Sequence, residues 1–225
     1  MRSLRNNKSL LLSIFSLAVM VPAIISLFSY KLPTVLAKAG RFQFLTNLAL
    51  ICSIIVFIIN IIAYITNSKI LYQLQNVTHS IALTMEMVVS IVYWPTRILY
   101  IDLIAETRVI QIPLYLDISI HLLPVIFLII DYYCFMPKWI LNYKQSYLIC
   151  SLLGSAYWVF LHSVIDQSTS RFPYPFLNVP FKNRLIIFIV VVQIAFLCFV
   201  IQKQLYNLIV GKDDDNNDNY NKKEK

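Results

Sequence analysis

Long hydrophobic stretches alternate with short polar connections along this chain. There are six such stretches, each about 20 residues long, which is the length that an α-helix needs to cross the hydrocarbon core of a bilayer. The expected spans are Leu10–Tyr30, Phe44–Ile65, Ile81–Ile101, Leu114–Phe135, Tyr147–Ile165 and Leu185–Leu208. The strand-length alternation typical of a membrane β-barrel does not occur. The pattern predicts an all-α integral membrane protein, a single bundle of six transmembrane helices.

Polar residues inside four of the stretches recur at the spacing of one helix face. In the fourth stretch Asp117, His121 and Asp131 share a face, because their separations are close to whole turns of an α-helix. The polar positions of the second, third and fifth stretches are Thr46, Ser53 and Asn60; Glu86, Ser90, Tyr93 and Arg97; and Ser151, Ser155, Trp158 and His162. Lipid offers these groups no hydrogen-bond partner. The four faces are therefore expected to converge on a polar centre, with the first and sixth stretches at the periphery.

Several of these polar residues are expected in the same half of the membrane. Thr46 lies near the start of the second stretch, His121 about two turns into the fourth, and Arg97 near the end of the third. Because successive helices run in opposite directions, these positions fall on one side, beneath the connection 171–176, whose prolines and aromatic residues suit a rigid cover. The sequence thus predicts that Thr46 and His121 face each other across the bundle.

The prominent polar residues also have purely structural interpretations. Thr46 is compatible with a threonine that bonds its own helix backbone, and His121 with a packed histidine that bonds Asp117 one turn away. Glu86 is compatible with a protonated bridge between helices, and Asp131, near the end of its stretch, with a solvated carboxylate. Both kinds of interpretation remain open at this point.

Composition and charge narrow the possible partners. Hydrophobic residues make up 59% of the chain and charged residues 13%, and the mean hydropathy is +0.69, as expected for a protein whose main partner is the lipid bilayer. The net charge of +8 comes from residues scattered at the membrane edges, so no nucleic-acid partner is expected. The four cysteines have no metal or disulfide spacing, and no nucleotide-binding loop is present, so no metal and no cofactor are predicted.

The ends of the chain predict its orientation and location. Residues 1–210 form the six-helix domain and residues 211–225 a disordered charged tail, too polar to pack. With an even number of helices and eleven of the 19 lysines and arginines on the N-terminal side, both termini are expected in the cytosol. Lys222 and Lys223 resemble a dilysine retrieval signal, which predicts the endoplasmic-reticulum membrane and coat proteins as partners; a merely solvated tail is the alternative.

Four motifs in chain order resemble the androgen-induced-gene family of membrane proteins, in its fungal form. Phe44-Leu45-Thr46-Asn47-Leu48 resembles the entry to that family's second helix. Tyr93-Trp94-Pro95, with Arg97, resembles the exit of its third helix. The run 113–124 around His121 resembles its histidine motif, and Pro173-Tyr174-Pro175-Phe176 its signature between helices five and six.

The resemblance implies a six-helix hydrolase of lipid esters, which in animal members are fatty acid esters of hydroxy fatty acids. Matched by motif, the family's nucleophile is Thr46 and its general base is His121. This pairing is chemically reasonable, because a weakly nucleophilic hydroxyl needs an adjacent base. We further expect Asp117 to orient the imidazole, and Arg97 or Trp94 to hold a carboxylate or an oxyanion.

Two other classes of function remain open from the sequence. In a small carrier or channel, Glu86, Asp117 and His121 would form a proton or solute path. In a non-catalytic membrane protein, the same polar centre would bind lipid or a partner. Labelling of Thr46 by a lipid fluorophosphonate is expected only of a hydrolase.

Overall fold

The computed structural model describes residues 5–100 and 112–211, so the third-helix end at Ile101 and the expected signal at Lys222 and Lys223 lie outside the described residues. Within these ranges the fold is helical, without strands. The long helices are α1 (Asn7–Ser29), α3 (Leu45–Thr66), α4 (Lys69–Leu99), α7 (Tyr143–Val164) and α8 (Phe181–Ile209). The shorter elements are α2 (Thr34–Ala37), the 3₁₀ turns η1 (Arg41–Gln43) and η4 (Pro175–Leu177), α5 (Leu114–His121), α6 (Leu123–Ile130) and the π-helical turn η3 (Asp131–Phe135).

Five of the described helices are long and apolar enough to cross a membrane, and α5 with α6 and η3 makes a bent pair that passes the same test together and brings the number to six if it counts as one broken span. The fourth helix, expected as one piece, is broken after His121 by 40°. Leu122 leaves the helical conformation (φ −128°, ψ −51°) two residues before Pro124. Pro124 lacks an N–H and its ring crowds the carbonyl of Ile120, which explains the break at this place.

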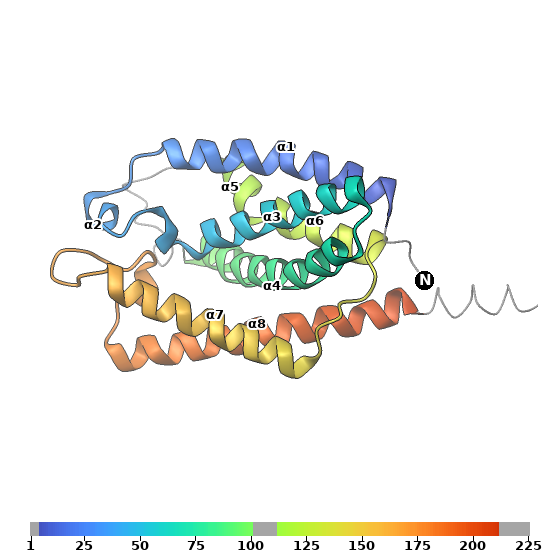
Figure 1. Ribbon diagram of the computed structural model, residues 1–225. Helices are drawn as coiled ribbons and strands as arrows, with labels where there is room; N and C mark the ends of the chain where they lie inside the picture. The colour runs from blue at the N-terminus through green and yellow to red at the C-terminus, as the bar shows by residue number, and fades with distance from the viewer. Residues whose placement is uncertain (1–4, 101–111, 212–225) are drawn as a thin grey trace, which may run out of the picture.

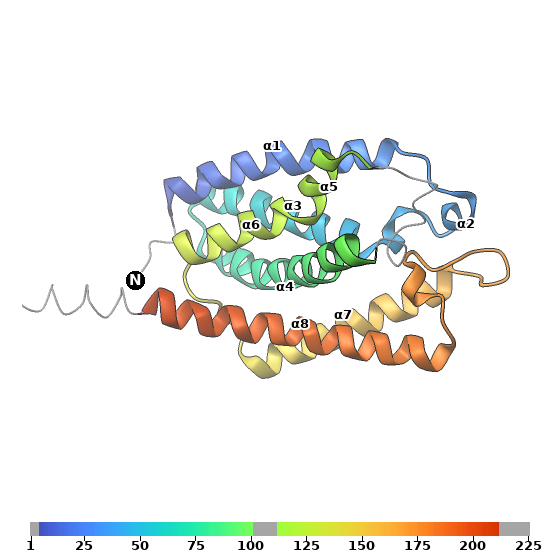
Figure 2. The ribbon, with the colours of Figure 1, turned by 180° about the vertical axis from the view of Figure 1, so that it is seen from behind.

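Two layers make up the bundle (Figure 1). In the first, α3 packs against both α1 and α4, and the broken span lies between α1 and α4. The second is the α7–α8 hairpin, which lies along α4, with α8 packed on α4 and α7 packed on α8 (Figures 1 and 2).

The expected position of the fifth helix was wrong. Helix α1 lies at the edge of the first layer and turns one polar face, with Ser9, Ser13 and Ser16, against its neighbours (Figures 1 and 2). Helix α7 does not turn its polar face to the centre: Ser155 is exposed, and almost none of the helix is buried. The hairpin contacts the first layer mainly through α8 on α4. Helix periodicity therefore predicted which polar residues of α7 share a face, but not what that face contacts.

Helix α4 starts twelve residues before the expected Ile81. The hydroxyl of Ser68 accepts a hydrogen bond from the N–H of Leu71 at 3.4 Å, and this cap lets the helix begin at Lys69. The extension brings His79 into the bundle. The start of α1 and the end of α8 lie at the same end of the bundle, and the start of α3 and the α7–α8 loop at the other (Figure 1).

Candidate functional site

His121, at the helix break, is held by one acidic neighbour, Asp117, and one aromatic neighbour, Tyr93. Its Nδ1 lies 2.9 Å from Oδ1 of Asp117, one turn earlier in α5, which is the contact expected from the sequence. Its ring stacks on Tyr93 of α4, with centroids 3.5 Å apart and planes 2° from parallel. The Tyr93 hydroxyl donates to the same Asp117 carboxylate, and Nη1 of Arg97 pairs with Oδ2 at 2.9 Å. The arrangement fixes the imidazole in one orientation.

The break in the helix also explains the hydrogen bond that Trp94 makes. The backbone carbonyl of His121 accepts hydrogen bonds from Ser90 Oγ at 2.6 Å and from Trp94 Nε1 at 3.2 Å, which replace the bond lost at the break. Trp94 and Arg97 therefore support His121 and Asp117. Neither side chain lines either of the two cavities described below, and the expectation that one of them holds a carboxylate or an oxyanion stays a prediction.

Thr46 lies in the first turn of α3, where backbone N–H groups have no partner within the helix. Phe44, the residue before the helix, provides no side-chain cap. Instead the hydroxyl of Tyr174, from the α7–α8 loop, accepts a hydrogen bond from the N–H of Leu45 at 2.9 Å. The Thr46 side chain, next to Leu45, is buried.

Thr46 and His121 line the same cavity, which has a volume of about 180 Å³. It lies between the α1–α3 connection, the histidine break and the α7–α8 loop, and it contains the arginines Arg41 and Arg171. No hydrogen bond joins Thr46 to His121, and Nε2 of His121 bonds none of the described residues. The free nitrogen of a histidine whose other nitrogen is held by a carboxylate is thus at a cavity that also contains a hydroxyl.

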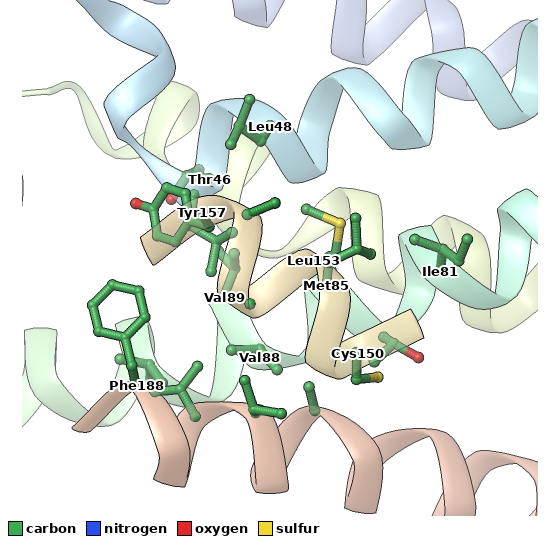
Figure 3. A pocket seen from close by; sticks show the side chains of 18 of the residues that line it. Thr46, Leu48, Ile81, Met85, Val88, Val89, Cys150, Leu153, Tyr157 and Phe188 are labelled. Atoms are coloured by element: carbon green, nitrogen blue, oxygen red, sulfur yellow. The ribbon is translucent and has the colours of Figure 1, made fainter. Parts of the chain in front are cut away.

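A second, larger cavity of about 450 Å³ separates α3 and α4 from the α7–α8 hairpin. Almost all of its lining is apolar. Figure 3 shows Thr46 and Tyr157 towards one end of this cavity, and Ile81 and Cys150 towards the other. Thr46, Tyr93 and Tyr174 line both cavities, so the threonine lies at their junction.

A second polar cluster, which the sequence interpretation missed, lies near the other end of α4. Asp131 is fully buried, so its expected solvation was wrong: its Oδ1 accepts from Ser9 Oγ at 2.7 Å and its Oδ2 lies 3.8 Å from His79 Nε2. Trp139 donates to Nδ1 of His79 at 3.3 Å, and Asn60 donates to Ser9 at 2.8 Å. A signal was available, since His79 is seven residues before Glu86 and fourteen before Tyr93, on the same face of α4.

The remaining polar residues have structural contacts. Glu86 accepts a hydrogen bond from Ser53 at 2.9 Å, which bridges α3 and α4 away from both cavities. His162 bonds the Trp158 carbonyl at 2.8 Å and lies 3.2 Å from Arg184 of α8. No group of three or more His, Cys, Asp or Glu able to hold a metal ion occurs in the described part of the chain.

The helices and their buried polar centre define a multi-pass membrane protein. The family described as FAR-17a/AIG1-like protein matches residues 8–207. The UPF0641 membrane protein YHR140W of Saccharomyces cerevisiae is 34% identical over 189 residues, which cover 76% of this chain and 79% of that protein. The UPF0641 membrane protein PJ4664.05 of Schizosaccharomyces pombe is 31% identical over 172 residues, 74% of this chain and 75% of that protein. No solved structure matches.

The chain therefore belongs to the FAR-17a/AIG1-like family, and its relatives include fungal members. This confirms the resemblance drawn from the four sequence motifs. The relatives are named as membrane proteins, in agreement with the apolar helices, and their names assign no reaction.

Proposed function

We propose that the chain is an intramembrane hydrolase of lipid esters, with Thr46 as nucleophile and His121 as general base. The observation that carries the proposal is the shared cavity of the two residues, with Nδ1 of His121 held by Asp117 and Nε2 available. The hydroxyl on α3, and the imidazole with its orienting carboxylate on α5, are the parts that nucleophilic ester cleavage needs.

The reaction follows from these positions. Nε2 of His121 takes the proton of Thr46 Oγ1 as this oxygen attacks the ester carbonyl, and the tetrahedral intermediate collapses with loss of an alkoxide. The alkoxide takes the proton from His121 and leaves as an alcohol. Water, deprotonated by His121, then cleaves the acyl-threonine to give the carboxylic acid and free Thr46. Catalytic hydrogen bonds are often long before substrate binds, which accommodates the separate positions of the two side chains here.

The cavities favour a substrate with a long apolar chain. The larger cavity is apolar along its length and reaches Thr46 at one end, so an acyl chain bound there would present its ester carbonyl to the hydroxyl. The smaller cavity, with Arg41 and Arg171, would take the polar part of the molecule. Fatty acid esters of hydroxy fatty acids, the class implied by the resemblance, combine these features.

The same apolar cavity also favours a second candidate function, which is lipid binding without chemistry. The two functions differ in what Thr46 does. Purified Thr46→Ala protein should bind a fluorescent fatty acid as the wild type does in either case. Hydrolysis of a lipid ester by the wild type, absent in Thr46→Ala and partly retained in Thr46→Ser, supports the hydrolase, whereas equal rates in all three proteins contradict it.

We further propose that the protein resides in the endoplasmic-reticulum membrane with both termini in the cytosol. The charge distribution and the resemblance of Lys222 and Lys223 to a retrieval signal read by coat proteins support this proposal. A C-terminal tag should be digested by protease added to sealed microsomes, and protection of the tag would contradict the orientation. Replacement of both lysines by serine should release the protein to later compartments.

A further inference from the structure

Tyr174 supplies to α3 a cap that the helix's own sequence lacks. The first N–H groups of an α-helix need acceptors from outside the helix, and the preceding side chain usually provides one. Here that residue is Phe44, and the acceptor for Leu45 N–H is the phenol oxygen of a residue 129 positions away. Thr46, the next residue of α3, lines the same two cavities as Tyr174.

The tyrosine itself is held firmly. Its ring packs edge-on against Phe44 (centroids 6.1 Å apart, planes at 85°) and stacks on Phe176 at 5.3 Å. Two residues of its loop are bonded to Arg184 of α8, whose Nε donates to the Leu177 carbonyl and whose Nη2 donates to the Val179 carbonyl, both at 2.8 Å. A phenol on such a support can fix a neighbouring hydroxyl.

A threonine at a helix start has competing arrangements. Its χ1 angle has three staggered values, and its hydroxyl can turn to a backbone carbonyl of the preceding turn, where the proton is unavailable for catalysis. A hydrogen-bonding partner at the junction of the two cavities favours the χ1 arrangement that directs the Thr46 hydroxyl towards that junction. Burial raises the pKa of Tyr174, so the phenol stays neutral at physiological pH and acts as a hydrogen-bonding partner, not as a base.

We propose that Tyr174 is a positioning residue for the reaction: its hydroxyl holds Thr46 Oγ1 at the junction of the two cavities, where it can attack an ester and pass its proton to His121. The inference rests on the proposed function, and two observations carry it: the hydrogen bond between the Tyr174 phenol and the first turn of α3, and the two cavities that Thr46 and Tyr174 both line. The loop that covers the site thereby also sets the geometry of the nucleophile.

The test compares Tyr174→Phe with Tyr206→Phe in the full-length protein. Both changes remove one tyrosine hydroxyl; that of Tyr206 donates to the Met136 carbonyl at 2.9 Å, at the opposite end of the bundle. For Tyr174→Phe we expect kcat to fall about tenfold, the loss of one hydrogen bond to the nucleophile, with KM changed less than about twofold because the ring remains. The acidic limb of the pH profile, set by His121, should not move. Tyr206→Phe should keep the wild-type kcat.

Wild-type kcat in Tyr174→Phe would overturn the inference, as would equal losses in both variants, which indicate a structural effect. If Tyr174→Phe accumulates poorly, the rate at which a long-chain fluorophosphonate labels the folded fraction in native membranes gives the same comparison, with about tenfold slower labelling expected. Thr46→Ala separates the two proposals. An active Thr46→Ala protein would contradict the proposed hydrolase mechanism itself. An inactive Thr46→Ala protein together with a fully active Tyr174→Phe protein would contradict only the positioning role of Tyr174.

Discussion

Within residues 5–100 and 112–211 the bundle contains two buried aspartate–histidine pairs, Asp117–His121 near one end and Asp131–His79 near the other. Both aspartates are fully buried, and both histidines are packed against aromatic rings. The two pairs differ in what surrounds the second nitrogen of the imidazole. His121 opens on a cavity that also contains Thr46, whereas neither cavity is lined by His79 or Asp131.

The two aspartates also differ in the residues that contact them. Around Asp131, the hydroxyl of Ser9 and the amides of Asn60 and Gln75 connect α1, α3 and α4 to the π-helical turn η3, so the cluster fastens four elements together. Around Asp117, the partners come from α4 and orient a single ring. Two similar aspartate–histidine pairs in one protein thus have different roles. The Asp131 pair holds helices together, and the Asp117 pair is a candidate functional site because its histidine reaches a cavity.

The largest difference in effect on turnover is expected between the two histidine variants, His121→Ala and His79→Ala. His121→Ala should lower lipid-ester turnover by about 10³-fold, since a general base contributes about 10²–10⁴. His79→Ala should leave turnover per folded molecule unchanged and lower the melting temperature. Turnover and thermal unfolding measured on the same detergent preparations check both expectations, and a similar loss of turnover in the two variants would remove the distinction.

The aspartates should differ in the same direction with a smaller effect on turnover. Asp117→Asn should cost roughly 100-fold in kcat, because the amide can no longer hold the imidazole in the required tautomer. Asp131→Asn keeps the shape of its side chain but places an amide where the carboxyl group contacts Ser9 and His79, which should cost about 2 kcal/mol of stability and no activity. An active Asp117→Asn enzyme would show that the orientation of His121 does not depend on the carboxylate.

One hydroxyl in the structural cluster gives a finer test. Ser9→Ala removes the 2.7 Å bond to Asp131 and the 2.8 Å bond from Asn60, and it should lower the free energy of unfolding by about 1–2 kcal/mol, without change in kcat or KM. Ser119→Ala is the matched control, because its exposed hydroxyl bonds only a carbonyl of its own helix. Equal stability of the two variants would show that the Asp131 cluster contributes little.

The smallest effect is expected in the α7–α8 loop, next to the cover of the site. The N–H and hydroxyl of Ser168 hold the pKa of Asp166 below its usual value, with further contributions from Thr169 and Lys38. Because the ionised form is favoured in the folded loop, its stabilisation is present above about pH 4 and is lost as the pH falls through the lowered pKa. Limited proteolysis of the loop should increase near pH 3 in the wild type, and already at pH 7 in Asp166→Ala.

Periodicity and hydrophobic length predicted the helical membrane fold and the polar faces of the second, third and fourth spans. They could not show that the polar face of α1 joins the Asp131 cluster or that α7 packs mainly on α8, because both helices are apolar on most sides and their partners depend on packing at long range. Pro124 was visible in the sequence, but the place of the break at Leu122 and its use to direct the His121 carbonyl towards Ser90 and Trp94 depend on α4. The sequence prediction started the third helix at Ile81 because it overlooked the cap at Ser68. His79 therefore fell outside the predicted helix, and the second polar cluster around it was missed.

Covalent labelling tests the central claim most directly. A long-chain fluorophosphonate should be attacked by Thr46, and peptide mass spectrometry should find the adduct on this residue in the wild type and in His79→Ala. The adduct should be missing in His121→Ala and Thr46→Ala. No adduct in the wild type, or an adduct at Thr46 that persists in His121→Ala at the wild-type rate, would contradict the account.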